Sequence, residues 1–384
     1  MKIGILTQPL HNNYGGLLQN YALQQVLKGM GHEVETVDWR YKRYKVLSEI
    51  KAWLLVRLRQ FKELLLRMLL KDRPPRPYPF TEKDRKLIGR NTHRFVEKYI
   101  SVCPVLVNSE AELRSIDKQH RYDGYVVGSD QVWRPQYNPP ALRTSMFLSF
   151  TDRKDVRRIA YAASFGTTDW EFTPELTETG ASLAKRFDLI TVRERSAVDL
   201  CKEHFGVEAI HVLDPTMLLN REDYEELVIA ECEPKSDGTL YHYILDASDE
   251  KTLLIENAAK ANGLQPFTVM PGSKWTLKHG IEECVFPPVT SWLRGFMDAE
   301  MVITDSFHGT VFSIIFNKPF WVIENSDRGS ARFESLLRLF KLEDRMIAPG
   351  QEVDWTQEID WDSVNAIRER EKQKSIALLQ GALK

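Results

Sequence analysis

The sequence predicts an α/β protein with two domains, each built on a parallel sheet that carries helices on both faces. The chain has 384 residues, about twice the length of an ordinary domain of roughly 100–200 residues. Hydrophobic residues make up 43% of the sequence, which is enough for buried cores and too much for a disordered chain. Short apolar runs alternate with amphipathic stretches along most of the chain, and this alternation is typical of parallel sheets.

The first βαβ unit lies at the N-terminus. Residues 2–7 form an apolar run that predicts a strand, and a polar loop with two glycines follows. Apolar residues then recur at helical spacing over 17–30, and residues 33–38 predict the second strand. The same reasoning predicts later strands at 125–127, 158–163, 189–192 and 210–213.

The C-terminal half is predicted as a second unit that begins after an acidic, turn-rich stretch. Strands are expected at 239–245, 266–270, 301–304 and 319–323, and helices at 250–262, 289–299 and 308–316. The predicted organisation is therefore an N-terminal domain at 1–230, a C-terminal domain at 231–350 and a charged helical tail at 351–384.

Composition excludes several classes of protein. The 52 basic and 54 acidic residues give a net charge of −2, which argues against a dedicated nucleic-acid binder. Four widely spaced cysteines disfavour a disulfide scaffold or a zinc site and fit a reducing compartment. The apolar run at the N-terminus is too short for a signal peptide, and no run approaches the roughly 18 residues of a membrane span. We therefore expect a cytoplasmic protein without a metal.

One segment departs from this average. Residues 40–76 carry twelve basic and three acidic residues, a net charge of +9, so the rest of the chain is about −11. Apolar residues recur there in three- and four-residue steps, which predicts amphipathic helix inserted into the N-terminal domain. Such a segment can lie on a membrane surface. It can equally form a helical hairpin that packs on the N-terminal domain and leaves its basic face in water.

Polar residues follow the predicted strands, at the edge where parallel sheets bind ligands. Gly15 and Gly16 lie in the loop after the first strand, beside Asn13, and can either cradle an anion at a helix N-terminus or form an ordinary turn. Neither a GxGxxG nor a P-loop pattern is present. After the third strand, the Asp130 carboxylate can accept hydrogen bonds from sugar hydroxyls and the Trp133 ring can stack on a sugar. Ser129 and Asp130 are also good helix caps.

Two further junctions carry charged groups. Arg193 and Arg195 flank Glu194 where a strand meets a helix, which suits a doubly anionic ligand or a salt-bridged helix start. The stretch TDSFHGT places His308 at the start of a buried helix, where an anion is favoured and an imidazole can move a proton. Its neighbours in this prediction are Ser306, Gly309 and Thr310, with Lys318 before the next strand.

Taken together, these stretches resemble the polysaccharide pyruvyl transferase family. The matching segments occur in family order over most of residues 1–340: GGLLQNYALQ, YDGYVVGSDQVWRP, IAYAASFG, TVRERSA, VLDPTMLL and MVITDSFHGTVFSIIFNKPF. The resemblance implies two Rossmann-like domains in a glycosyltransferase-B-like arrangement. It also implies transfer of the enolpyruvyl group of phosphoenolpyruvate to two hydroxyls of a sugar, galactose-type or N-acetylhexosamine, in a surface-polysaccharide precursor (capsule or exopolysaccharide). Phosphoenolpyruvate is then a co-substrate, and no cofactor is expected.

The resemblance assigns roles to the residues singled out above. Those expected to be catalytic are His308, Asp130 and Arg193. Those expected to bind the donor are Arg193, Arg195, Ser306, His308, Gly309, Thr310, Lys318 and Arg332. Those expected to bind the acceptor are Asn13, Gly15, Gly16, Asn20, Ser129, Asp130 and Trp133. His308 is either the general acid or a phosphate ligand.

One departure from the family concerns Ser306, since some members carry an arginine there; Arg193 or Arg332 is expected to balance the donor's charge instead. If the acceptor is a sugar on a polyprenyl diphosphate, residues 40–76 are expected to bring the protein to the inner face of the membrane as a peripheral protein. Two other functions fit the same frame. One is a nucleotide-sugar glycosyltransferase in which Glu324 reads the nucleotide, and the other is a non-catalytic glycan- or lipid-binding protein.

Overall fold

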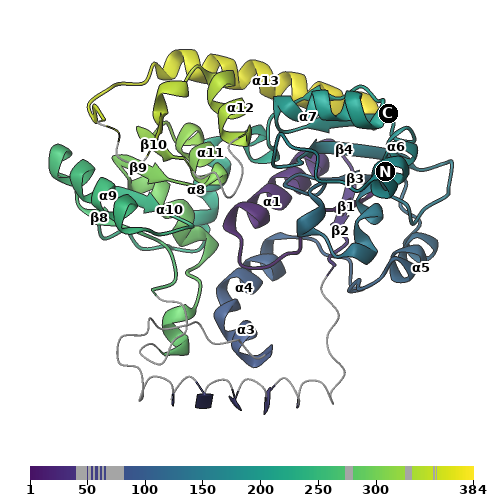
Figure 1. Cartoon of the computed structure of the whole chain (residues 1–384), viewed down its shortest axis with the longest axis horizontal. Helices are drawn as coiled ribbons and strands as arrows, with labels where there is room; N and C mark the ends of the chain where they lie inside the picture. The colour runs from purple at the N-terminus through teal and green to yellow at the C-terminus, as the bar shows by residue number, and fades with distance from the viewer. Residues whose placement is uncertain are drawn as a thin grey trace.

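The computed structural model describes most of the chain. It covers residues 1–39, 50, 53–54, 57–58, 61–62, 65, 82–272, 280–324, 331–348, 351 and 353–384. Two parallel sheets with helices on both faces lie side by side (Figure 1). The predicted pair of Rossmann-like domains is confirmed.

The N-terminal sheet has six parallel strands in the order β2-β1-β3-β4-β5-β6. Their bounds are β1 (Lys2–Leu6), β2 (Glu33–Thr36), β3 (Gly124–Val127), β4 (Arg157–Ala163), β5 (Leu189–Val192) and β6 (Ile210–His211). The order places β1, β3, β4 and β5 at the centre, where their apolar residues are buried on both faces. The loops that follow these strands all emerge at one edge.

The C-terminal sheet has five parallel strands in the order β11-β10-β9-β7-β8. Their bounds are β7 (Leu240–Tyr243), β8 (Pro266–Phe267), β9 (Met301–Thr304), β10 (Phe320–Ile323) and β11 (Met346–Ile347). Strand β8 is shorter than the predicted 266–270, because only two of its residues pair with β7.

Helices supply both layers of each domain, and those predicted at 17–30, 250–262, 289–299 and 308–316 lie close to their predicted positions. Those that precede the domain junction are α1 (Tyr14–Gly29), α3 (Glu82–Ile88), α4 (Arg90–Tyr99), α5 (Glu110–His120), α6 (Pro174–Ala184), α7 (Arg195–Leu200) and α8 (Arg221–Ala230). Those that follow it are α9 (Asp249–Asn262), α10 (Val289–Asp298), α11 (Phe307–Ile315), α12 (Ala331–Phe340) and α13 (Trp361–Ala382).

Helix α1 connects the two domains through its first residue. The Tyr14 ring stacks on Trp292 of α10 with 5.7 Å between ring centroids, and the Tyr14 hydroxyl donates to the carbonyl oxygen of Pro287 at 2.9 Å. Both rings are fully buried, in a core cluster that draws residues from both domains. The start of α1 is therefore held against the C-terminal domain, which fixes the glycines that follow Tyr14.

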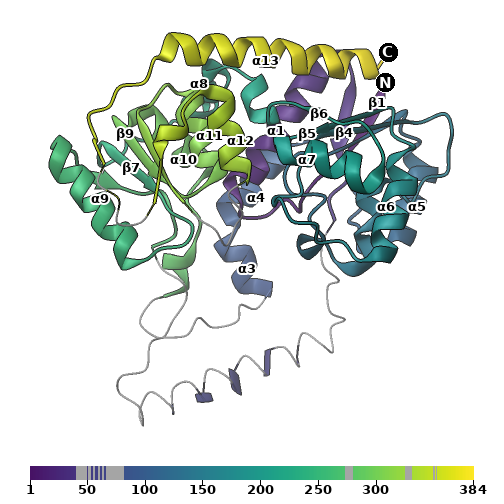
Figure 2. The ribbon, with the colours of Figure 1, turned by 45° about the horizontal axis from the view of Figure 1, so that its top comes forward.

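Helix α13 crosses back from the C-terminal domain to the N-terminal domain (Figures 1 and 2). Lys372 donates from Nζ to Oδ1 of Asn220 at 2.6 Å, and the Ser375 hydroxyl accepts from the amide of Leu213 at 3.4 Å. Leu379 is fully buried. The segment predicted as a charged helical tail thus packs as a layer of the N-terminal domain.

The predicted basic insertion at 40–76 lies mostly outside the described residues. Those described within it are helical, and their large apolar side chains are 44–60% exposed: Ile50, Trp53, Leu54, Leu58, Phe61 and Leu65. Exposed apolar residues at this spacing form one stripe, which we call the 50–65 stripe. No helix in the part of the chain that the structure describes is long and apolar enough to cross a membrane.

Candidate active site

A cavity of about 970 Å³ opens between the two domains at the carboxyl edges of their sheets. Its walls include the loop after β1, the loop after β3, the starts of α11 and α12, and the helices α3 and α4. Six of the predicted site residues line it: Asn13, Gly16, Asp130, Ser306, His308 and Arg332. Parallel sheets typically bind ligands at this edge, so the position fits the prediction.

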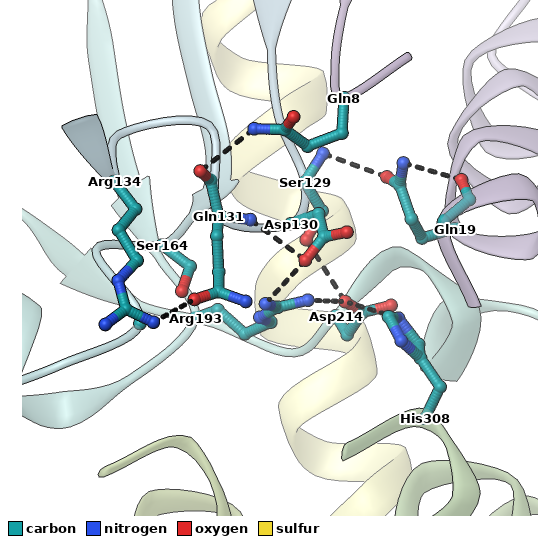
Figure 3. Close-up of polar contacts among 12 residues, drawn as sticks. Gln8, Gln19, Ser129, Asp130, Gln131, Arg134, Ser164, Arg193, Asp214 and His308 are labelled. Carbon is teal, nitrogen blue, oxygen red and sulfur yellow. Dashed lines mark hydrogen bonds and ion pairs between the residues drawn. The ribbon is translucent and has the colours of Figure 1, made fainter. Parts of the chain in front are cut away.

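His308 lies in the first turn of α11 and is 6% exposed. Ser306 caps this helix, because its hydroxyl oxygen accepts from the amide of Gly309 at 3.4 Å. The imidazole crosses to the other domain, where its Nε2 lies 3.7 Å from Oδ2 of Asp214 (Figure 3). At this distance the contact is an ion-pair geometry, longer than a hydrogen bond. Asp214 is thus the acid that faces the imidazole from the N-terminal domain.

Gly15 packs against the opposite side of the same imidazole. A Cβ atom built on Gly15 would lie 2.1 Å from Nδ1 and 2.7 Å from the Cβ of His308. No side chain can occupy that space unless His308 moves. Gly15 does not line the cavity, so its role is to give His308 room, in place of the predicted contact with an acceptor.

Arg193 holds two carboxylates together beneath the cavity (Figure 3). Its Nη1 donates to Oδ2 of Asp214 at 3.0 Å and its Nη2 donates to Oδ1 of Asp130 at 3.1 Å. Burial alone would raise the pKa of both carboxyls, but His308 and Arg193 hold the pKa of Asp214 well below its ordinary value, and Arg193 and His308 lower that of Asp130. Both carboxyl groups are therefore ionised, and each is paired with Arg193.

The loop after β3 is fixed from α1 and from the loop after β1. The Ser129 amide donates to Oε1 of Gln19 at 3.0 Å, and the Ser129 hydroxyl donates to Asp214 at 3.1 Å. Gln8 donates from Nε2 to the carbonyl oxygen of Gln131 at 3.0 Å (Figure 3). Ser129 is thus a fully buried positioning residue, and the loop presents Asp130 to the cavity wall.

Arg332 is the buried guanidinium that lines the cavity itself. It lies over the ring of Phe307, 5.7 Å from the ring centroid, while Arg193 lies 4.4 Å from the same centroid. Burial and the neighbouring charge of Arg193 lower the pKa of Arg332 to about 10, so it is still a cation at neutral pH. Arg193 is paired with two acids and does not line the cavity, whereas Arg332 does line it, so Arg332 is the buried cation that an anion in the cavity would meet.

Three predicted site residues lie away from the cavity. Trp133, predicted to stack on a sugar, is 1% exposed and stacks instead on Phe147 with 5.0 Å between centroids. Lys318 precedes β10, so it lies at the amino edge of the sheet, and its Nζ donates to the carbonyl oxygen of Met297 at 2.9 Å. Asn20 is buried beneath α1, where its Oδ1 accepts from the Thr36 hydroxyl at 2.9 Å.

Three others support the site or lie outside it. A Cβ on Gly309 would lie 2.2 Å from Oγ1 of Thr304, so this glycine serves helix packing and not a ligand. The hydroxyl of Thr310 donates to the carbonyl oxygen of Ser306 at 3.1 Å and is fully buried. Arg195 is exposed, and neither Arg195 nor Arg193 lines the cavity, so the structure does not place the predicted pair of donor-binding arginines after β5 on the cavity wall.

Asp214 is the site residue that the sequence reasoning missed. It follows β6 in the stretch VLDPT, and its position at the end of a strand was the available signal. Glu324, assigned to nucleotide recognition in the glycosyltransferase alternative, is exposed and does not line the cavity that the described residues form.

Potential metal ligands gather elsewhere. Among the described residues, Glu35, Cys103 and His120 form one such group, and none of them lines the cavity. His120 lies between the other two, with Nδ1 3.1 Å from Glu35 and Nε2 3.8 Å from Cys103.

The ion pairs of Arg193 predict a large effect on stability. Arg193→Met leaves the two buried carboxylates without their common partner, and breaking a buried pair costs roughly 3–5 kcal/mol. We expect the urea midpoint of unfolding to fall accordingly, whereas Arg195→Met, an exposed change two residues away, should stay within about 0.5 kcal/mol of the parent. Equal midpoints for the two variants would show that Arg193 is not the structural centre of the site.

The fold and the site define a two-domain α/β protein with an interdomain cleft whose histidine, arginines and carboxylates suit the transfer of an anionic group. The sequence profile of the family described as polysaccharide pyruvyl transferase matches residues 13–327. The chain belongs to this family, which implies a transferase that acts on polysaccharide.

Solved structures resemble the chain at low identity. UDP-GlcNAc 2-epimerase of Methanocaldococcus jannaschii, in complex with UDP-GlcNAc and UDP, shares 12% identity over 96% of this chain and 92% of its own, with a TM-score of 0.48. S. aureus MnaA with UDP shares 10% identity over 100% of this chain and 91% of its own, with a TM-score of 0.45. The wall teichoic acid polymerase TagF shares 11% identity over 98% of this chain and 90% of its own, with a TM-score of 0.41. No curated protein matches the chain. The described residues of this chain form two parallel-sheet α/β domains that share one cavity, as predicted.

Proposed function

We propose that the protein transfers the enolpyruvyl group of phosphoenolpyruvate onto two hydroxyls of a sugar, as a pyruvate ketal, in a surface-polysaccharide precursor. The observation that supports this most is that His308 and Arg332 both line the cavity, with Arg332 over the ring of Phe307, the residue before His308, and Asp214 behind the imidazole. A proton donor and a cation at one place match a substrate that must be protonated and that carries a phosphate and a carboxylate.

The reaction needs one proton delivered to carbon and one anion expelled. A proton added to the methylene carbon of phosphoenolpyruvate leaves C2 electron-poor, and one sugar hydroxyl bonds to C2 and loses its proton. The second hydroxyl then bonds to C2, the bond from C2 to the phosphate oxygen breaks, and phosphate leaves with the remaining proton. Two C–O bonds form and one breaks, without an oxidant or a cofactor.

His308 is the group that we assign to the proton transfer. Its Nε2 faces Asp214, so we assign the exchange of a proton with the donor to the other ring nitrogen, Nδ1. Arg332 is assigned to the charge that develops as phosphate leaves, and stabilising such charge is usually a large catalytic contribution. Asp130, held by Arg193, lies at the wall where the sugar hydroxyls must approach.

Binding of the donor can be tested without knowing the sugar. At about 100 times its dissociation constant, a ligand stabilises the folded protein by roughly 2.7 kcal/mol. We expect phosphoenolpyruvate to raise the melting temperature in a thermal-shift experiment, and Arg332→Gln to remove most of this rise. Stabilisation by a nucleoside diphosphate with none by phosphoenolpyruvate would favour the glycosyltransferase alternative.

The 50–65 stripe supports a further part of the proposal, that the acceptor is attached to a polyprenyl diphosphate at the membrane surface. Its apolar side chains are exposed, within a segment whose net charge is +9. A helix that combines an apolar stripe with basic residues lies in the interface of an anionic membrane.

Vesicle binding tests this assignment. Trp53→Glu combined with Phe61→Glu is expected to weaken binding to anionic phospholipid vesicles by at least about tenfold, because two large apolar groups would no longer enter the interface. Leu253→Glu is the control, because Leu253 lies on α9, outside the stripe, and its exposure of 58% is similar to that of Trp53 and Phe61. Unchanged co-sedimentation of the double variant would contradict a membrane role for the stripe.

A further inference from the structure

One wall of the cavity is cationic and has no part in the chemistry described above. Helices α3 and α4 contribute five basic or histidine side chains to the lining: Arg85, Lys86, Arg90, His93 and Arg94. The acids on the same wall are Glu82 and Glu97. Figure 1 shows these helices apart from α11 and α12, which carry His308 and Arg332. The cavity therefore has a second cationic region.

The size of the cavity leaves room for a ligand at this wall. Pockets of roughly 300–1,000 Å³ enclose molecules of drug size, and the cavity measures about 970 Å³. A donor with three carbon atoms and one phosphate fills a small part of that volume. The acceptor must occupy part of the remainder while its hydroxyls reach His308, and the wall formed by α3 and α4 lines that remainder.

An ion pair already present on this wall is weak enough to exchange for a ligand. Arg90 lies 3.0 Å from Glu282, and the two side chains are 52% and 64% exposed. Arg94 lies 2.8 Å from Glu231; the arginine is 70% exposed, but the carboxylate is 12% exposed and also accepts from Lys98 and Tyr99, so this pair is the firmer of the two. An ion pair whose partners are both exposed, as Arg90 and Glu282 are, contributes little to stability, whereas guanidinium groups bind phosphate through two parallel hydrogen bonds.

We propose that the α3–α4 wall binds the diphosphate of a sugar diphosphate, with the sugar directed toward His308. The direction of the sugar toward His308 rests on the proposed function, whereas the binding of the diphosphate is inferred from the charge of the wall. A sugar diphosphate can carry a polyprenyl chain or a nucleoside. The described residues of the 50–65 stripe lie on the same side of the molecule as α3 (Figures 1 and 2), which favours the polyprenyl chain.

The test compares two lysines on one helix. Lys86 lines the cavity, and Lys83, three residues earlier on α3, does not. Affinity for methylenediphosphonate, measured by calorimetry, is expected to fall at least about tenfold in Lys86→Gln and in Arg90→Gln, as for the loss of one charge-assisted hydrogen bond. Lys83→Gln should bind as the parent does. Equal affinity in all three variants would overturn the proposal.

Two further arms identify the source of the diphosphate and separate this proposal from the proposed function. A farnesyl-diphosphate-linked sugar should bind more tightly than a UDP-sugar with the same sugar, and the reverse order would overturn the polyprenyl assignment. These are binding measurements, so they stand whether or not pyruvyl transfer occurs. With turnover, Lys86→Gln should raise KM for the sugar diphosphate and leave KM for phosphoenolpyruvate unchanged.

Discussion

His308→Ala is expected to lower the rate of pyruvyl transfer by at least about a hundredfold, because general acid catalysis by a positioned side chain contributes about 10²–10⁴-fold. The measurement is phosphate release from phosphoenolpyruvate in the presence of a glycan acceptor. Alanine keeps the helix α11 and its Ser306 cap, so the loss reports the imidazole and not the fold.

A matched control for this variant is His32→Ala. His32 precedes β2 and lies at the amino edge of the N-terminal sheet, away from the cavity. It should keep the parent rate. Near-normal phosphate release by His308→Ala would remove His308 from the chemistry and leave Arg332 as the main catalytic group.

Gly15→Ala is expected to cause a loss of rate comparable to that of His308→Ala, although it adds a single methyl group. The new Cβ would lie 2.1 Å from Nδ1 of His308, so the imidazole must leave its position beside Asp214. Gly15 lies in a regular helix, where alanine is favoured over glycine by roughly 0.5–1 kcal/mol. This gain opposes the cost of overpacking, about 1–3 kcal/mol, so the variant should still fold. Steady-state kinetics and a urea titration of the same sample distinguish the two effects.

The same helix provides the control. A Cβ on Gly29, at the end of α1, would meet no atom within 4 Å. Gly29→Ala should therefore match the parent in rate. If Gly15→Ala turned over as fast as Gly29→Ala, the proposed place of His308 between Gly15 and Asp214 would be wrong.

The fold was largely predictable because the apolar runs that form its strands are short, buried on both faces and bounded by polar loops. The strand at Leu189–Val192 matches its prediction at both ends, and α9 differs by one residue. The packing of α13 across the N-terminal domain was not predictable in this way. It depends on contacts such as that of Lys372 with Asn220, between residues far apart in the sequence.

Prediction of the site depended on which edge or face a residue occupies. His308 and Asp130 follow strands, so their place at the carboxyl edge was predictable. Trp133 follows the same strand as Asp130, but its indole turns into an aromatic core, and composition alone cannot give the direction of a side chain. Lys318 precedes its strand, so it lies at the opposite edge of the sheet from the one that its predicted role required. The role of Gly15 appears only when α1 and α11, from different domains, are placed in contact.

The most direct test of the central claim is mass spectrometry of a glycan precursor after incubation with the protein and phosphoenolpyruvate. Ketal transfer predicts a product heavier than the acceptor by one pyruvic acid less one water, formed with one equivalent of phosphate and absent with His308→Ala. An unchanged glycan mass with intact phosphoenolpyruvate, or a mass increase that requires a nucleotide sugar, would contradict the assignment.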